Sequence, residues 1–261
     1  MSEEGMYLYA IIPTDHERNF GPIGLPVRNT QTGIGGRGDE VGTIAYRDIS
    51  AVVSNSPLTR YVISKENLVA HERVVERIMQ EFTVLPVRFC TVAANPEEIR
   101  RLLEQRYLEL KHLLRDMDGK VELGVKALWR KMEIIFREIV DEDEEIKRLK
   151  TEVAGKPSRH AHAKQIAIGE MVQAALQAKK EREAEEILAG LKRASVEYRL
   201  NGTVGDKMLF NAAFLVDRSR EREFDELVER LDLRYRERIK FAYVGPVAPY
   251  NFVNITLHPE E

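Results

Sequence analysis

Apolar and polar positions in the first part of the chain alternate between strand-like and helix-like patterns. Residues 7–12 are apolar, aromatic and β-branched and end at Pro13, which predicts a buried strand. Residues 13–40 are rich in glycine and polar side chains and predict a long surface loop. Two short apolar runs, 41–45 and 49–54, are separated by a polar turn and predict a β-hairpin.

Two helices are predicted next along the chain. Ser64 can cap the first helix, whose apolar residues recur at steps of three and four and so predict one buried face. That face carries Leu68, His71, Val75, Ile78 and Phe82. Pro96 suits the first turn of the second helix, because its missing N–H costs nothing there, and Asp118-Gly119 ends that helix. A short strand at 84–89 is expected between the two helices.

The second part of the chain begins with a strand and continues with a long helical region. Apolar residues alternate with mostly polar ones at 121–129, as in a half-buried strand. A helical pattern follows at about 130–194, but the charged stretch 179–186 interrupts its apolar stripe. We therefore expect that stretch, including Glu183 and Glu185, to project into solvent.

The remaining pattern predicts a hairpin followed by smaller elements. The runs 196–200 and 208–216 flank Asn201-Gly202, which suits a turn. The run 208–216 is almost continuously apolar, so we expect it to be a central strand. The later elements are a helix at 224–231, a strand at 238–244 and a short last strand at 252–257.

This order of elements predicts an α+β protein of two domains. Residues 1–118 form an irregular N-terminal α+β domain in this interpretation. Residues 119–261 follow the order β, α, β, β, α, β, which is that of a ferredoxin-like domain, an antiparallel sheet with helices on one face. The helical region at about 130–194 is then a long insertion within the second domain.

Composition narrows the class of protein. The 261 residues carry a formal net charge of −3, so the overall basic field typical of nucleic-acid-binding proteins is missing. Cys90 is the only cysteine, which excludes a disulfide within the chain and favours a reducing compartment. The apolar runs are shorter than the about 20 residues of a membrane helix, and the N-terminus is acidic, unlike a signal peptide. We therefore expect a cytoplasmic protein without membrane insertion.

One group of residues has the side-chain types needed for catalysis or ligand binding. His71 is followed by Glu72, and Arg88 lies close to Cys90 in the sequence. Since His71 occupies the apolar face of its helix, we prefer a core histidine with one hydrogen bond to a general base or metal ligand. Arg88 could hold a carboxylate bidentately, but a structural pair with an acid of the preceding helix, such as Glu72, is preferred. Cys90 is interpreted as a buried structural thiol.

Two other patterns imitate functional motifs. His160 and His162 alternate as zinc ligands do on a strand, but residues two apart on a helix do not share a face. The glycine-rich stretch 33–38 is followed by a predicted strand rather than a helix, and it lacks the Gly-Lys-Ser/Thr of a phosphate loop. We therefore predict no metal ion, no cofactor and no catalytic residue.

The C-terminal stretch 245–252 combines glycine, proline and aromatic residues. Its Gly-Pro and Pro-Tyr pairs favour a turn, and Tyr250 and Phe252 supply aromatic side chains. These two residues are candidates for a surface that binds a partner protein. They are equally suited to locking the final strands against the sheet, and the residues alone leave both interpretations open.

Six segments, in order along the chain, resemble one known family. They are residues 6–12 (MYLYAII), 46–57 (YRDISAVVSNSP), 71–92 (HERVVERIMQEFTVLPVRFCTV), 119–129 (GKVELGVKALW), 208–218 (MLFNAAFLVDR) and 245–253 (GPVAPYNFV). They are similar to the gas vesicle GvpL/GvpF family over nearly the full length. The chain departs from the family pattern at Cys90, where the family usually has glycine. It departs again at Val247 and Ala248, which replace a tryptophan and a proline, and within 155–165.

The resemblance implies an accessory protein of gas vesicle assembly rather than an enzyme. Its implied partners are the small hydrophobic shell protein, which it would keep from aggregating, and other gas vesicle accessory proteins. The chain could instead become a minor component of the vesicle. The alternative from another class is a ferredoxin-like ligand-binding regulator or an enzyme that uses His71, Glu72, Arg88 and Cys90. A scaffold that binds partners through the charged helix 179–186 is a third interpretation.

Overall fold

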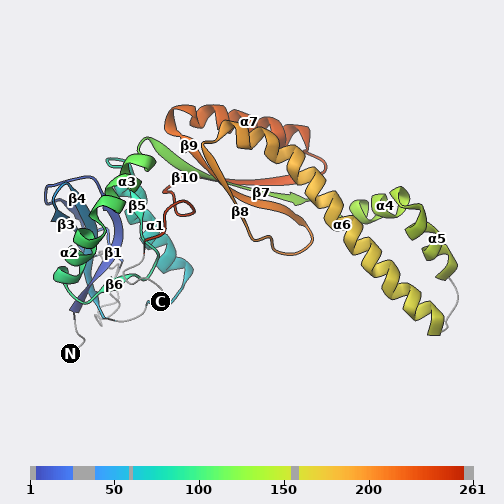
Figure 1. Cartoon of the computed structure of the whole chain (residues 1–261), viewed down its shortest axis with the longest axis horizontal. Coiled ribbons are helices and arrows are strands. Elements are labelled where there is room, and N and C mark those ends of the chain that lie inside the picture. Colours follow the sequence, from blue (N-terminus) through green and yellow to red (C-terminus); the bar gives the residue numbers. More distant parts are fainter. Residues whose placement is uncertain (1–3, 26–38, 59–60, 154–158, 256–261) are drawn as a thin grey trace. The chain divides into compact units, whose positions relative to one another are not determined.

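The computed structural model describes residues 4–25, 39–58, 61–153 and 159–255. The chain forms two compact units: unit 1 consists of Met1–Glu122 and Gly245–Glu261, and unit 2 consists of Leu123–Val244. Each unit has its own β-sheet (Figure 1). The glycine-rich stretch 33–38 lies outside the described residues.

Helices and strands are mixed in both units, which confirms the predicted α+β class. The ferredoxin-like detail of the second domain stays a prediction. The two units differ from the predicted domains, 1–118 and 119–261, in the place of the last residues. Residues from Gly245 onward group with unit 1, because the chain returns to it after the last strand of unit 2.

The sheet of unit 1 is built around its first strand. β1 (Glu4–Ile12) pairs antiparallel with β4 (Ile49–Pro57), and β4 pairs with β3 (Val41–Tyr46) across a two-residue turn that joins Tyr46 to Ile49. The order of the sheet is β2-β3-β4-β1-β5, with β6 also paired to β1. The three short strands are β2 (Asn19–Gly21), β5 (Leu85–Pro86) and β6 (Val92–Ala93).

The helices of unit 1 begin where the sequence predicts. Ser64 caps α1 (Lys65–Met79), and Asn95 caps α2 (Pro96–Gln105), each through a side-chain oxygen that accepts a backbone N–H. The predicted single helix after Pro96 is in fact two, because the backbone leaves the helical conformation at Arg106 before α3 (Tyr107–Met117). Gly119 has a φ of +64°, which is readily adopted by glycine and ends α3.

The predicted strand at 84–89 shrinks to the two residues of β5. Pro86 lacks the N–H that a longer ladder requires. The N–H of Val87 still donates to the carbonyl of Tyr9 at 2.9 Å, so this segment stays attached to β1.

The sheet of unit 2 has the strand order β10-β7-β9-β8. Its strands are β7 (Lys120–Trp129), which begins in unit 1, β8 (Glu197–Asn201), β9 (Met208–Asp217) and β10 (Ile239–Val247). β8 and β9 pair antiparallel, as the predicted hairpin requires. β9 is an inner strand, which confirms the prediction from its apolar run. The predicted strand at 252–257 is not found in the described residues, which end at Ile255.

Two helices cover one face of the unit 2 sheet. α6 (Arg159–Ala194) and α7 (Glu221–Arg234) lie side by side over it, with the single turn η1 (Arg218–Arg220) leading into α7 (Figure 1). Phe214 of β9 packs against Phe224 of α7, with ring centroids 5.2 Å apart. The alternate apolar residues of β7 are fully buried, as predicted: Val121, Leu123, Val125, Ala127 and Trp129.

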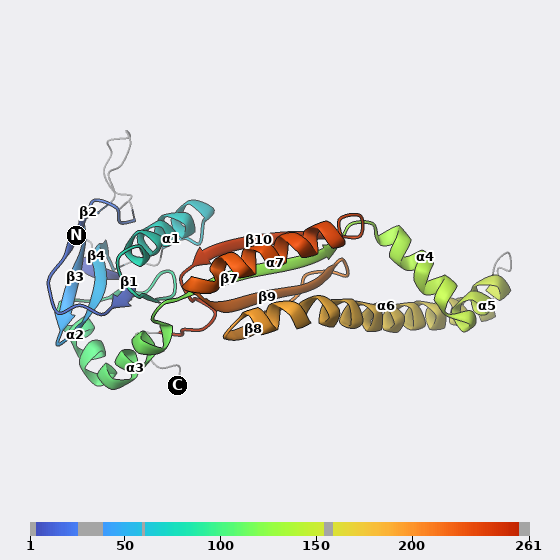
Figure 2. The same ribbon diagram turned by 90° about the horizontal axis from the view of Figure 1, so that it is seen from above.

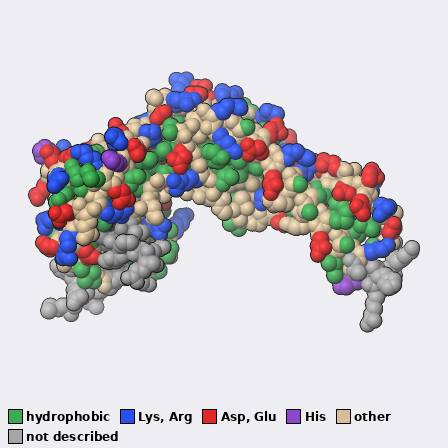
Figure 3. Space-filling model, in the orientation of Figure 1, with side chains coloured by type: hydrophobic (Ala, Val, Ile, Leu, Met, Phe, Trp, Pro, Cys, Tyr) green, Lys and Arg blue, Asp and Glu red, His purple; other side chains and the backbone are tan. Residues whose placement is uncertain are grey.

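The helical insertion forms an arm in unit 2. α4 (Met132–Glu142) and α5 (Glu144–Val153) lie along the N-terminal half of α6, beyond the end of the sheet (Figure 2). The buried apolar residues of this arm are few: Ile135, Ile139, Ile146 and Leu176. On the visible surface, acidic and basic side chains are interspersed, which agrees with the small net charge (Figure 3).

Candidate functional site

His71 lies in the core of unit 1, where α1 packs against β1. Its side chain is buried, and its Nδ1 lies 3.0 Å from the hydroxyl of Tyr7. That hydroxyl accepts the N–H of Cys90 at 2.8 Å, so its own hydrogen is available to His71. Burial lowers the pKa of His71 to about 4, so the ring is neutral at pH 7 and too weak a base for general-base catalysis there.

The other residues of the predicted cluster do not converge with His71. Glu72 and Arg88 are exposed, whereas His71 points into the core. Cys90 is half-buried, and its sulfur accepts the N–H of Tyr61 at 3.2 Å. This arrangement gives no common space in which these side chains could act on one ligand. The structural interpretation of His71 therefore has the better support.

Cys90 adopts a backbone conformation that is unusual for its residue type. Its φ is +69°, in the left-handed region that favours glycine. The conformation directs the N–H of Cys90 toward the Tyr7 hydroxyl and its sulfur toward Tyr61. This geometry would be adopted more readily by glycine than by cysteine.

The aromatic side chains of the C-terminal segment are not a free surface in this structure. Phe252 is 7% exposed, and Tyr250 packs against the core of unit 1 with its ring centroid 6.3 Å from that of His71. Asn251 donates two hydrogen bonds to the carboxylate of Glu122, at 2.8 Å from its backbone and 2.6 Å from its side chain. These contacts favour the interpretation that the segment locks the chain end in place.

The histidines of the long helix give no support to a metal site. His162 is an exposed residue of α6, and the side chain of His160 lies outside the described part. Among the residues that the structure describes, no group of three or more His, Cys, Asp and Glu is placed to hold a metal ion. Each helix in the described ranges is too short or too polar to span a bilayer.

A groove beside α3 is a candidate site in unit 1. Its volume is about 600 Å³. It is bounded by α3 and the residue that follows it, by the turn between β3 and β4, by Pro13 after β1 and by Thr83 before β5. The lining residues are Pro13, Asp48, Ile49, Thr83, Tyr107, Leu108, Lys111, His112, Leu114, Arg115 and Asp118. Sequence analysis missed this groove, because its walls come from four separate segments of the chain.

One wall of the groove is held by a compact polar cluster. Asp48, in the turn, accepts hydrogen bonds from the hydroxyl of Tyr107 and from the Nζ of Lys111 at 2.6 Å. The hydrogen bond from Lys111 lowers the pKa of Asp48. Arg47 has a φ of +54° and places its guanidinium over the Tyr107 ring, 4.9 Å from the centroid. These contacts fix the turn against α3.

The groove has an apolar interior and charged residues of both signs around it. Leu108 is 70% exposed there, whereas Leu110, Leu114 and Met117 of the same helix are buried. Lys111 and Arg115 lie around it together with Asp48 and Asp118, and Asp118 accepts a hydrogen bond from Thr83 at 2.7 Å. Such a surface suits an apolar segment of a partner.

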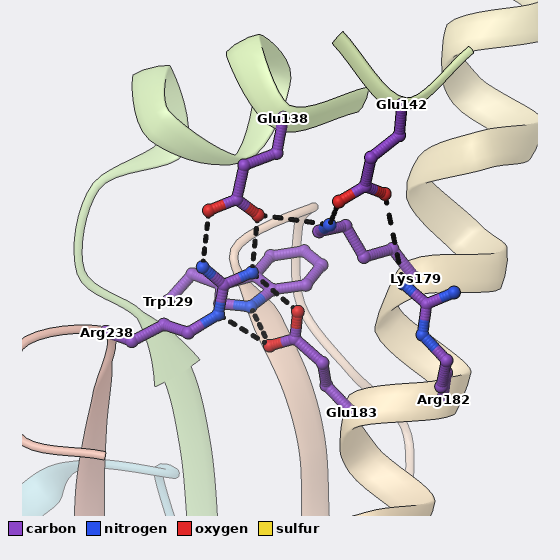
Figure 4. A network of polar contacts seen from close by, with 7 residues as sticks. All are labelled: Trp129, Glu138, Glu142, Lys179, Arg182, Glu183 and Arg238. Atoms are coloured by element: carbon purple, nitrogen blue, oxygen red, sulfur yellow. Dashed lines mark hydrogen bonds and ion pairs between the residues drawn. The ribbon is translucent and has the colours of Figure 1, made fainter. Parts of the chain in front are cut away.

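A second polar cluster lies in unit 2, where α4 meets α6 and the start of β10 (Figure 4). Arg238 makes two hydrogen bonds of 2.7 Å to Glu138, and its guanidinium also donates to Glu183 at 2.6 and 3.1 Å. The indole N–H of Trp129 donates to Glu183 at 2.9 Å. Lys179 lies 3.0 Å from Glu138 and completes the connection between the two helices. These contacts hold the helical arm to the sheet.

The prediction that 179–186 projects into solvent is wrong for part of the stretch, which includes the buried Ala184. Lys179 is only 5% exposed, and the side chain of Glu183 is 15% exposed. Both face α4 and the sheet, because their charges are matched by Glu142, at 2.7 Å from Lys179, and by Arg238. The sequence did carry a signal, since Glu138 and Glu142, like Lys179 and Glu183, are four residues apart and share a helix face.

Comparisons with known proteins extend over both units. The family model described as gas vesicle synthesis protein GvpL/GvpF matches residues 5–254. Gas vesicle protein F of Nostoc sp. (strain PCC 7120) is 28% identical over 256 residues, which cover 97% of this chain and 99% of that protein. Gas vesicle protein L of Streptomyces sp. (strain CB03234) is 31% identical over 196 residues, 71% of this chain and 68% of its own length.

Solved structures agree with the sequence comparisons. The crystal structure of GvpF from Anabaena sp. PCC7120 superposes with a TM-score of 0.79 at 28% identity, covering 98% of this chain and 100% of that one. The structure of GvpF from Microcystis aeruginosa gives 0.74 at 25% identity, over 95% and 98% of the two chains. The match extends through the segments quoted above and both sheets. The chain therefore belongs to the gas vesicle GvpL/GvpF family.

Proposed function

We propose that this gas vesicle accessory protein binds the small hydrophobic shell protein through the groove beside α3 and keeps it from aggregating during assembly. The observation that carries the proposal is the apolar groove of about 600 Å³ with Leu108 exposed inside it. A concave, mainly apolar surface can bind an apolar segment of another protein.

The driving force is the removal of apolar surface from water. A hydrophobic shell subunit outside a finished vesicle exposes apolar area, and covering it yields about 25 cal/mol per Å². Lost translational freedom and ordering of the partner offset part of that gain, so we expect only micromolar affinity.

Co-expression with the shell protein tests the proposal. Shell protein should move from the pellet to the supernatant when this chain is present and should be recovered in a complex with it. Leu108→Asp should abolish the shift, because a charge in the groove replaces the apolar contact. Leu233→Asp is the matched control, since Leu233 is 69% exposed on α7, far along the chain in unit 2. It should leave the shift unchanged.

Two results would count against the proposal. If shell protein sediments equally with and without this chain, the chain does not keep it soluble. If both leucine variants behave like the wild type, binding occurs elsewhere. The second candidate role, a minor component of the vesicle, is tested by isolating vesicles, washing them at high salt and probing for the chain. Retention on the washed vesicles at a constant, low ratio to the shell protein would favour that role.

A further inference from the structure

The outer edge of the unit 2 sheet is an open strand. β8 is the last strand in the order β10-β7-β9-β8, and in the described part of the chain it is paired to β9. Val196, Tyr198 and Leu200 are 53%, 39% and 58% exposed. An edge strand directs every second N–H and C=O away from its sheet, where another strand can pair with them.

The sequence of this edge has a symmetric chemical pattern. Residues 196–200 read Val, Glu, Tyr, Arg, Leu: an aromatic centre, opposite charges on either side, and an aliphatic residue at each end. We propose that two copies of this chain associate by antiparallel pairing of their β8 edges, with Tyr198 at the two-fold axis. Each Val196 then lies opposite Leu200 of the second copy, and each Glu197 lies opposite Arg199.

The charges select this pairing among the possible registers. Glu197 and Arg199 are about half-exposed and form an ion pair of 3.3 Å within one chain. Centring the two-fold on Tyr198 places opposite charges across from each other twice. Centring it on Glu197 or on Arg199 places like charges across from each other, which is unfavourable. Because the contact is two-fold symmetric, it closes at two copies.

The side-chain faces also agree with the pairing. The register of β8 with β9 places Tyr198 beside Phe214 and Leu200 beside Ala212, so the apolar residues of the edge continue the apolar face of the sheet. A second copy extends that face across the axis. Charged residues on an edge strand often prevent such pairing, because like charges on two copies repel each other. Here the two charges attract the second copy.

The size of the contact sets its strength. Five residues on each side form a smaller contact than a standard protein interface, so the dimer is weak and depends on concentration. Sedimentation equilibrium from about 1 μM to about 1 mM should show the average mass rise from one chain toward two. A mass of one chain over the whole range overturns the proposal.

Charge reversal provides the sharper test. E197R and R199E should each weaken association about tenfold or more, because each places like charges opposite each other twice. A mixture of E197R with R199E should associate again, since every cross-strand pair is then opposite in sign, and the double variant should associate like the wild type. The control is R222E on α7, which reverses a charge of another exposed ion pair, that with Glu226, and should leave association unchanged. Singles that associate normally, or a mixture that does not recover, overturn the proposal.

A cross-link locates the axis. In a Cys90→Ala background, Tyr198→Cys places two thiols directly opposite each other, within the range of a disulfide. Leu200→Cys places them about four residues apart along the strands, roughly 14 Å, which is too far. Oxidation should therefore yield a covalent dimer from the first variant and not the second. Equal yields from both overturn the register. This inference is independent of the groove beside α3.

Discussion

The two polar clusters of the molecule differ in the charge of their central side chain. In unit 1, His71 is buried and neutral, and its Nε2 has no hydrogen-bond partner among the described residues. In unit 2, Arg238 is about 30% exposed and fully charged, with two carboxylates around it. In the first cluster the histidine stays uncharged, because burial penalises its charged form. In the second cluster the side chains stay charged, and each charge lies beside an opposite one. The two units should therefore respond differently to pH and to loss of one partner.

The pKa values express the difference directly. Burial lowers the pKa of His71, whereas the hydrogen bonds from Arg238 lower the pKa of Glu138 to about 2. Glu138 thus stays ionised down to strongly acidic pH. Mildly acidic pH lowers the free energy of unfolding of unit 1, because His71 binds a proton in the unfolded chain but stays neutral in the folded one.

The largest effect is expected from removing the centre of the charged cluster. Arg238→Ala leaves Glu138 and Glu183 close together with only Lys179 to balance them, so we expect a loss of about 3 kcal/mol in the free energy of unfolding. Arg193→Ala, at an exposed position of α6, is the control and should cost under about 0.5 kcal/mol. Urea denaturation of both variants gives the comparison. Equal losses would mean that the cluster does not hold the arm.

The next effect is the pH dependence of unit 1. The folded pKa of His71 is about 4, below its ordinary value of 6.5, so the unfolded chain binds more protons between these values. Stability is therefore full above pH 6.5 and is lost as pH falls, by about 2 kcal/mol at pH 5. Denaturant melts from pH 7.5 to 5 measure it. His71→Phe should flatten this part of the profile, whereas Glu138→Gln should not; an unchanged slope in the first variant would contradict the assignment.

The sequence predicted the elements that local periodicity determines. The alternation in β7, the buried face of α1 and the hairpin of β8 and β9 each depend on neighbours two to four residues apart. The first and the last were confirmed. The face of α1 was confirmed at His71, Val75 and Ile78, but Leu68 is 36% exposed and Phe82 lies beyond the end of the helix. The break at Arg106 was missed, because the apolar stripe continues from α2 into α3 without interruption. An apolar stripe indicates which face of a helix is buried, but it does not indicate where the backbone leaves the helical conformation.

The candidate sites depend on contacts that periodicity does not contain. Arg238 meets residues 55 and 100 positions away, so a charged run on α6 looks like a solvated face until its distant partner is known. The groove beside α3 likewise joins Pro13, Asp48 and Asp118 from separate segments. The symmetric pattern of residues 196–200 was visible in the sequence, but its meaning depends on β8 being an edge strand.

A third, smaller effect separates two glutamates of the same helix. From the sequence, Glu183 and Glu185 were both expected to project into solvent, where replacement by alanine costs under about 0.5 kcal/mol. The structure keeps that expectation for Glu185, an exposed residue paired with Lys192. Glu183→Ala should instead cost about 1–2 kcal/mol, because the indole N–H of Trp129 and the guanidinium of Arg238 lose their acceptor. Thermal melts of the two variants, read side by side, decide between these expectations.

The smallest effect has the opposite sign and concerns Cys90. At a φ of +69°, a side chain costs about 1 kcal/mol that glycine does not. Cys90→Gly also raises the conformational entropy of the unfolded chain and removes the sulfur that accepts the Tyr61 N–H. Together these two losses offset about half of the gain. We therefore expect a stabilisation of about 0.5 kcal/mol. Cys90→Ala keeps the strain and loses the same contact, so it should be less stable than the wild type. If glycine and alanine change the free energy of unfolding equally, the backbone at this position is not strained, and the sulfur alone determines the effect.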